Sequence, residues 1–172
     1  DRAGRGVNVI LAAASAFPKQ TFHVVGGSES EVAFWRARAS KNVEFYGYQP
    51  SSLIPLLMRK FDVALMPYEP NLTLANSSFS TLDWMSPMKM FEYMAGRKVI
   101  ISSDFEVLRE VLNADNSYLI DPNDQDAWIN CLAAVLESYQ IARTKAEKGH
   151  NVFLQRHTWD ARILHLKSFD CF

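Results

Sequence analysis

The chain of 172 residues carries 18 basic and 19 acidic side chains, a net charge of −1, and 48% of its residues are hydrophobic. This apolar content excludes a disordered chain, and the length predicts one domain with a substantial core. The near-neutral charge argues against a nucleic-acid-binding surface, and no apolar run reaches the ~20 residues of a membrane helix. Two cysteines, Cys131 and Cys171, make no disulfide framework and favour a reducing compartment.

Strand-like runs alternate with helical ones along the chain. This alternation predicts an α/β, Rossmann-like fold, in which a parallel sheet has helices on both faces. Apolar runs without strict alternation indicate strands that are covered on both sides. In chain order we predict helix 9–17, strand 21–26, helix 29–41, strand 43–47, helix 51–60, strand 62–67, helix 87–95, strand 98–103, helix 104–112, strand 117–121, helix 125–139 and helix 160–169.

Particular side chains support two of these helices. Asp104 is an N-cap residue type and predicts the start of helix 104–112. In the last helix, Ile163 and Leu166 are expected on the side that faces the protein.

The four histidines lack metal-ligand spacing, and His23 is expected to be a satisfied core or edge residue.

The stretch 69–86 shows no firm hydrophobic periodicity and is rich in Asn, Ser and Thr. Loops of this length inside a compact domain are usually functional. It follows strand 62–67, so it starts at the carboxyl edge of the predicted sheet, where doubly wound folds bind their ligands. Gly26, Gly27 and the turn at 47–50 lie at the same edge, which places the expected site there.

The most informative motif is the helix that follows this stretch. Ser86 and Pro87 open it and Gly96 ends it, and the free N–H groups of a first turn form an anion site. Lys89 in that turn opposes the helix dipole, which a bound phosphate would explain. Lys89 and Glu92 are three residues apart and share one face, so a cation and a hydroxyl acceptor lie together. The spacing alone favours the alternative, an ordinary surface pair worth ~0.3 kcal/mol.

This segment, S-P-M-K-M-F-E-Y-M-A, resembles the donor-binding helix of retaining GT-B glycosyltransferases of family 4, the glycosyl transferases group 1. Many members carry S-P-x-K-x-x-E-Y-M-A and then a strand that ends V-I-x-S-D. Further pieces resemble the family in the same order, so the resemblance covers nearly the whole chain. They are R-G-V-N-V-I (5–10), F-H-V-V-G-G (22–27), V-E-F-Y-G (43–47), D-V-A-L-M-P (62–67), D-P-N-D (121–124) and T-W (158–159).

The resemblance implies that a nucleotide diphosphate sugar binds at the start of this helix. Glu92 would hold the ribose hydroxyls, and Lys89 would face the diphosphate together with Ser86, Pro87 and Met88.

Four other residues take implied roles around the nucleotide. Arg5 stands where the family often has a phosphate-binding lysine, with a solvated terminal arginine as the alternative. Backbone groups of Tyr48 and Gln49 would edge the nucleobase, although Tyr48 also suits plain packing. Gly27 would allow close approach of the ligand or of a second domain, or it serves only the turn.

The sequence departs from the family at two places. Many members have paired glutamates, E-x7-E, but Trp84 stands at the first position here, which leaves the sugar contact and the catalytic residues open. The family's domain also opens with a strand before the residues that match Arg5 and Gly6. We therefore expect residues 1–172 to be the nucleotide-sugar-binding C-terminal domain, without its first strand and without the acceptor-binding N-terminal domain.

The implied function is donor binding for a retaining glycosyltransferase. The complete enzyme would transfer a hexosyl unit to a saccharide or lipid-linked acceptor in polysaccharide, lipopolysaccharide or glycolipid assembly, while this chain alone would be inactive. No metal or other cofactor is expected, because basic side chains and helix dipoles neutralise the leaving group. The location would be cytoplasmic, with the inner membrane face and peripheral membrane contact of the complete enzyme as further options.

Two other functions stay open. A nucleotide-sugar epimerase of the same fold would need acid and base carboxylates, of which this chain shows no clear set. A non-catalytic nucleotide-binding module would agree with Trp84 in place of the first glutamate.

Overall fold

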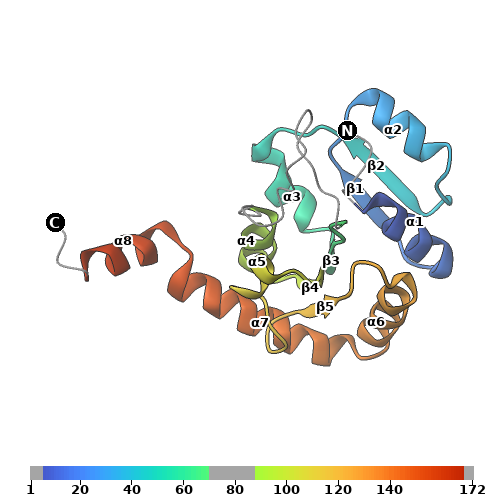
Figure 1. Ribbon diagram of the computed structural model, residues 1–172. Helices are drawn as coiled ribbons and strands as arrows, with labels where there is room; N and C mark the ends of the chain where they lie inside the picture. Colours follow the sequence, from blue (N-terminus) through green and yellow to red (C-terminus); the bar gives the residue numbers. More distant parts are fainter. Residues whose placement is uncertain (1–5, 70–87, 169–172) are drawn as a thin grey trace.

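The structure is a computed structural model that describes residues 6–69 and 88–168 (Figure 1). Strands and helices alternate as predicted up to the last strand. The strands are β1 (Phe22–Val25), β2 (Val43–Gly47), β3 (Val63–Met66), β4 (Val99–Ser103) and β5 (Tyr118–Ile120). The helices are α1 (Val7–Ala16), α2 (Glu29–Arg36), the 3₁₀ turn η1 (Ser51–Leu53), α3 (Ile54–Met58), α4 (Met88–Ala95), α5 (Glu106–Arg109), α6 (Gln125–Glu137), α7 (Tyr139–Arg156) and α8 (Trp159–Lys167).

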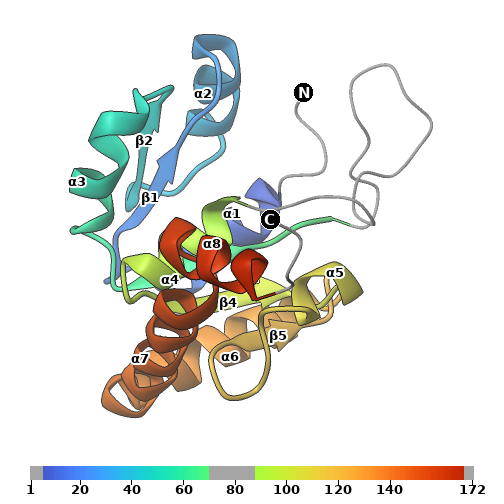
Figure 2. The same cartoon turned by 90° about the vertical axis from the view of Figure 1, so that its left-hand side faces the viewer.

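All five predicted strands are present, and every pairing between them is parallel. They form two sheets and not one: β1 pairs with β2, and β4 lies between β3 and β5. Figure 2 shows the β1–β2 pair standing apart from β4 and β5. The predicted Rossmann-like class is therefore confirmed, with a break between β1 and β3 that the sequence pattern did not indicate.

Helices cover both faces of the three-stranded sheet. Val99 and Ile101 of β4 face a core that includes Trp128 and Leu132 of α6. Ile100, between them, faces a second core with Met90 and Met94 of α4. All five residues of β4 are buried, as expected for a central strand whose alternate side chains enter two different cores.

One long helix, α7, was not predicted. Its buried residues are Ala142, Ala146 and Gly149, spaced four and three apart, so small residues form its inner stripe. In α4 and α6, by contrast, large apolar side chains form the buried stripe, and this is the pattern that predicts a helix from the sequence. α7 packs closely against α4 and β4, where small residues permit a short approach.

Two predictions about individual helix residues are wrong. Asp104 does not cap α5: the N-cap is Phe105, and the Asp104 carboxylate instead accepts two hydrogen bonds from Arg109, at 2.5 and 2.6 Å. Ile163 and Leu166 do not face the protein, because 47% and 54% of their surfaces are exposed. The reason is that α8 extends away from the sheets beyond the end of α7 (Figure 1).

The start of α1 fits closely against the end of β3. Gly6, the N-cap residue, has φ 63°, and a Cβ built there would lie 1.7 Å from the carbonyl oxygen of Pro67. A left-handed backbone and contact with a neighbouring main chain both require glycine. This contact places the beginning of α1 at the carboxyl edge of β3.

Gly6→Ala should therefore lower the free energy of unfolding by more than the ~1–2 kcal/mol that a left-handed conformation costs an alanine. Gly149→Ala is the matched control, since its added Cβ would make only ordinary contacts, at 3.6 Å or more, inside a helix. Urea denaturation of both variants measures the difference. Equal stability of the two variants would contradict the tight fit at Gly6.

Candidate functional site

The carboxyl edge of β3 and β4 is ordered by main-chain and hydroxyl contacts. β3 ends at Met66, and the chain continues through Pro67 and Tyr68 along this edge. The buried hydroxyl of Ser103, at the end of β4, donates a hydrogen bond to the carbonyl oxygen of Tyr68 at 2.7 Å. The chain that leaves β3 is thereby held over the end of β4.

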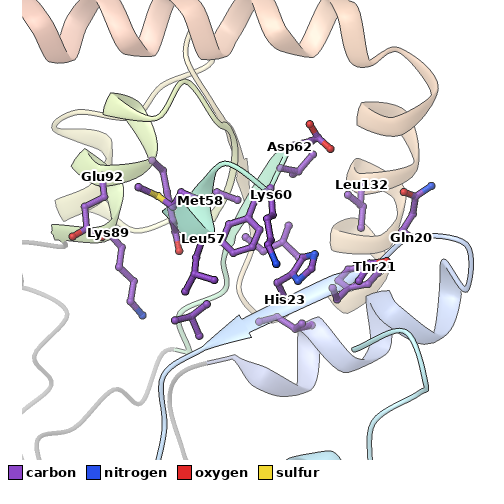
Figure 3. A pocket seen from close by; sticks show the side chains of 18 of the residues that line it. Gln20, Thr21, His23, Leu57, Met58, Lys60, Asp62, Lys89, Glu92 and Leu132 are labelled. Atoms are coloured by element: carbon purple, nitrogen blue, oxygen red, sulfur yellow. The ribbon is translucent and has the colours of Figure 1, made fainter. Parts of the chain in front are cut away.

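α4 presents the two predicted charged residues beside this edge. Met90 and Met94 are buried against the sheet, while Lys89 and Glu92 are exposed on another side of the helix. Both charged residues line one cavity of about 280 Å³. Figure 3 shows them leaving the same helix at one end of that cavity. The structure thus places the predicted cation and carboxylate at one cavity.

The cavity extends away from α4. Leu57 and Met58 of α3 line the part next to α4, and Leu132 of α6 lies beside Gln20 at the far end (Figure 3). Gln20, Thr21 and Asp62 lie at the opposite end from Lys89 and Glu92 (Figure 3). Lys60 and His23 lie between these two ends (Figure 3), so polar groups are present along the length of the cavity.

Tyr93 also lines the cavity. Burial, with smaller contributions from Tyr68 and the Glu92 carboxylate, raises the pKa of Tyr93 to about 12. Its phenol is protonated at neutral pH and keeps an O–H that can donate a hydrogen bond.

Gly27 and Tyr48 lie in a second hollow. Gly27 has φ 86°, and the Gly26 N–H donates to the carbonyl oxygen of Gly47 at 2.7 Å, which joins the ends of β1 and β2. Tyr48 has 81% of its surface exposed, so it is not a packing residue. Gln49 lines neither hollow, and its side-chain amide donates to the Tyr46 carbonyl oxygen at 2.8 Å.

Of the remaining predicted site residues, Met88 lies within the described part of the chain. Met88 is the first residue of α4 that the structure describes, and 66% of its surface is exposed. Arg5, Ser86 and Pro87 lie outside the described residues, as does Trp84.

A polar group on paired strands was not predicted as a unit. His23 of β1 lies opposite Glu44 of β2 in the register, and the Tyr46 hydroxyl donates to the Glu44 carboxylate at 2.6 Å. The His23 Nδ1 is 3.0 Å from that hydroxyl and 3.3 Å from the carboxylate. The hydrogen bond from Tyr46 holds the pKa of Glu44 below its usual value. His23 is thus a half-buried, satisfied strand residue, as expected.

Residues 6–69 and 88–168 contain neither a metal-binding cluster nor a membrane-spanning helix. No group of three His, Cys, Asp or Glu side chains in these ranges is arranged to hold a metal ion. None of the helices described there has the length and apolar character needed to cross a membrane.

Comparisons with known proteins agree on one family. Residues 2–138 match the family described as "Glycosyl transferases group 1". No curated protein matches the sequence. Because the family match spans more than half of the chain, it confirms the resemblance predicted from the motifs.

Solved structures confirm the fold. Sucrose-phosphate synthase from Thermosynechococcus elongatus aligns over 99% of this chain and 42% of its own, with TM-score 0.76 and 20% identity. Anabaena Alr3699/HepE in complex with UDP aligns over 98% and 46%, with TM-score 0.72 and 19% identity. The C-terminal domain of LpcC, a glycosyl transferase group 1 family protein from Francisella tularensis, aligns over 91% and 81%, with TM-score 0.69 and 18% identity. The chain thus spans less than half the length of the first two structures.

A capping box stabilises the start of α2, beside the second hollow. The Glu31 carboxylate accepts hydrogen bonds from the backbone and hydroxyl of Ser28, next to Gly27, at 2.8 and 2.9 Å. The backbone bond is the main cause that lowers the pKa of Glu31 to about 2. A lowered pKa in the folded state adds stability above the usual pKa of 4.5, and this stability is lost as the pH falls toward 2.

Glu31→Gln should therefore be less stable than the wild type near neutral pH, with the gap closing as the pH falls toward about 2. Urea denaturation at several pH values in that range measures the difference in the free energy of unfolding between the variant and the wild type. Glu29→Gln is the control, because Glu29 lies in the same first turn outside the capping box. A gap that does not depend on pH would contradict the assignment.

Proposed function

This chain belongs to the glycosyl transferases group 1, and we propose that it holds the nucleotide diphosphate sugar for a retaining hexosyltransferase. One observation carries this proposal. Lys89 and Glu92 leave the same side of α4 and line one end of a single cavity. The two groups suit the two polar parts of such a donor, its diphosphate and its ribose.

The diphosphate would bind at the beginning of α4. Lys89 lies in the first described turn, where the helix dipole also favours an anion. As the bond to the sugar breaks, negative charge grows on the diphosphate leaving group. A fixed cation and oriented N–H groups stabilise that charge, and this is a contribution to catalysis as well as to binding. In this proposal no metal ion is needed for that step.

Glu92 would accept hydrogen bonds from the ribose hydroxyls. It lies one turn after Lys89, so a phosphate bound at the helix start and a ribose beside it reach the two side chains in order. Its carboxylate is exposed and therefore accessible to a ligand. A carboxylate accepts from two hydroxyls at once, which suits a vicinal diol.

The nucleobase would lie toward Tyr48. This exposed aromatic ring lines the same hollow as Gly27, whose lack of a side chain leaves room for a close approach. From the family resemblance, Arg5, Ser86, Pro87 and Met88 would complete the diphosphate site, and Gln49 would edge the base.

The relatives support the substrate class. Anabaena Alr3699/HepE has been crystallised with UDP and with UDP-glucose. Since that protein aligns with nearly all of this chain, uridine diphosphate sugars are the first donors to test.

The transfer reaction would belong to a longer protein. A separate acceptor domain would bring a saccharide or lipid-linked acceptor to the donor, in polysaccharide, lipopolysaccharide or glycolipid assembly. Cytosolic synthesis of activated sugars favours a cytoplasmic site of action.

Lys89→Ala should weaken nucleoside diphosphate binding by about tenfold or more, because a charge-assisted contact of ~1.5–3 kcal/mol is lost. Isothermal titration calorimetry with UDP, GDP and ADP measures the change. Lys148→Ala is the matched control, since this lysine of α7 pairs with Asp115, which lies outside the cavity. No binding of any of the three nucleotides, or equal affinity in both variants, would refute the proposal.

Glu92→Ala should remove the preference for the ribose hydroxyls. The wild type is expected to bind UDP about tenfold more tightly than 2′,3′-dideoxy-UDP, and the variant to bind both alike. The same calorimetry compares the four affinities. A variant that still discriminates between the two nucleotides would place the ribose elsewhere.

A further inference from the structure

Tyr93 of α4 has no part in the donor contacts proposed above, although it lines the same cavity as Lys89 and Glu92. It directly follows Glu92 and lies four residues after Lys89, so the Lys89 and Tyr93 side chains are neighbours one turn apart on the helix. It is the tyrosine of the E-Y-M-A motif, to which the family resemblance assigned no role. Its position makes a further contact with the donor possible.

The protein fixes the position of Tyr93 from two sides. Its ring packs against the second core, which contains Met90 and Met94. Its carbonyl oxygen accepts a hydrogen bond from the Lys98 N–H at 3.0 Å, which ties the end of α4 to the residue before β4. A ligand therefore does not need to order the phenol, and a group that is already in place binds at a lower entropic cost.

The Tyr93 hydroxyl makes no hydrogen bond to any group in the part of the chain that the structure describes. Tyr46 shows the contrast, since its hydroxyl donates to the Glu44 carboxylate at 2.6 Å. With a pKa of about 12, the Tyr93 phenol keeps its proton at neutral pH. A half-buried donor without an acceptor is unfavourable, so an acceptor that enters the cavity gains from this hydroxyl.

Glu92 and Tyr93 offer complementary groups to one kind of ligand atom. The Glu92 carboxylate only accepts hydrogen bonds, while the protonated Tyr93 phenol has one to donate. The two groups are close enough for the carboxylate charge to contribute to the raised pKa of Tyr93. A hydroxyl suits both at once, because it donates its proton to the carboxylate and accepts from the phenol. A phosphate oxygen accepts only, and the negative charge of Glu92 repels it.

We propose that Tyr93 is a second ribose-binding residue: its phenol donates a hydrogen bond to the ribose hydroxyl whose own proton goes to Glu92. This assignment rests on the proposed function, because it needs the ribose beside Glu92. The site then recognises both the donor and the acceptor side of one hydroxyl, which favours ribonucleotides over deoxyribonucleotides. Lys89, one turn earlier, stays with the diphosphate.

Tyr93→Phe removes the hydroxyl and keeps the ring. It should weaken UDP binding about fivefold and leave the affinity for 2′,3′-dideoxy-UDP unchanged, because only UDP has the ribose hydroxyls. Isothermal titration calorimetry measures both affinities. Tyr118→Phe is the matched control, since this tyrosine of β5 packs against the core that contains Trp128 and does not line the cavity. Equal UDP affinity in Tyr93→Phe and the wild type, or an equal loss for both nucleotides, would overturn the inference.

A double-variant cycle tests whether Glu92 and Tyr93 act on the same hydroxyl. In Glu92→Ala the hydroxyl is no longer held beside the phenol, so adding Tyr93→Phe should change the UDP affinity by less than about twofold. A further loss of about fivefold would place the Tyr93 contact elsewhere on the nucleotide and contradict the assignment.

Stability gives a readout that does not depend on nucleotide. Tyr93→Phe and the wild type should have the same free energy of unfolding in urea, because the lost hydroxyl has no partner among the described residues. A clearly less stable variant would reveal a structural partner and sink the inference. Wild type that binds UDP as the variant does refutes only the role of Tyr93. Wild type that binds no nucleotide refutes the proposed function, and this inference with it.

Discussion

The burial of Met90 and Met94 against the sheet fixes the orientation of α4, and the candidate site depends on that orientation. These residues are four apart and lie in the second core with Ile100 of β4. A helix anchored along one stripe must present its remaining positions elsewhere. Lys89 and Glu92 occupy such positions, so the packing that stabilises the domain also sets the direction of its charged groups.

β4 transmits this constraint to the rest of the molecule. Its five residues are all buried, with alternate side chains in the two cores. The α4 side of the sheet and the α6 side therefore cannot shift independently. α7 adds to this, since its stripe of small residues lies close to α4 and β4, and the His150 Nδ1 is 3.1 Å from the Met94 carbonyl oxygen at the end of α4.

Local features of the sequence predicted most elements because they are encoded by neighbouring residues. Apolar runs gave the five strands, and the i, i+3 spacing of Lys89 and Glu92 placed both side chains at one cavity. Helix α7 was not predicted because the buried residues of its inner stripe are alanine and glycine. The prediction for Asp104 was wrong because its carboxylate can either cap the following helix or pair with Arg109, five residues later. In the structure it pairs with Arg109. The break in the sheet depends on which strands pair. Because paired strands are far apart in the sequence, a local pattern does not predict where the sheet is interrupted.

The chemistry of the cavity favours its α4 end for a charged ligand. A diphosphate loses several kcal/mol of hydration when it enters an apolar space, so apolar side chains such as Leu57 and Met58 do not suit it. Lys89 and Glu92 are exposed at the α4 end, where a bound diphosphate would stay partly hydrated and meet an opposite charge. The packing that buries Met90 and Met94 therefore also decides which end of the cavity suits a nucleotide.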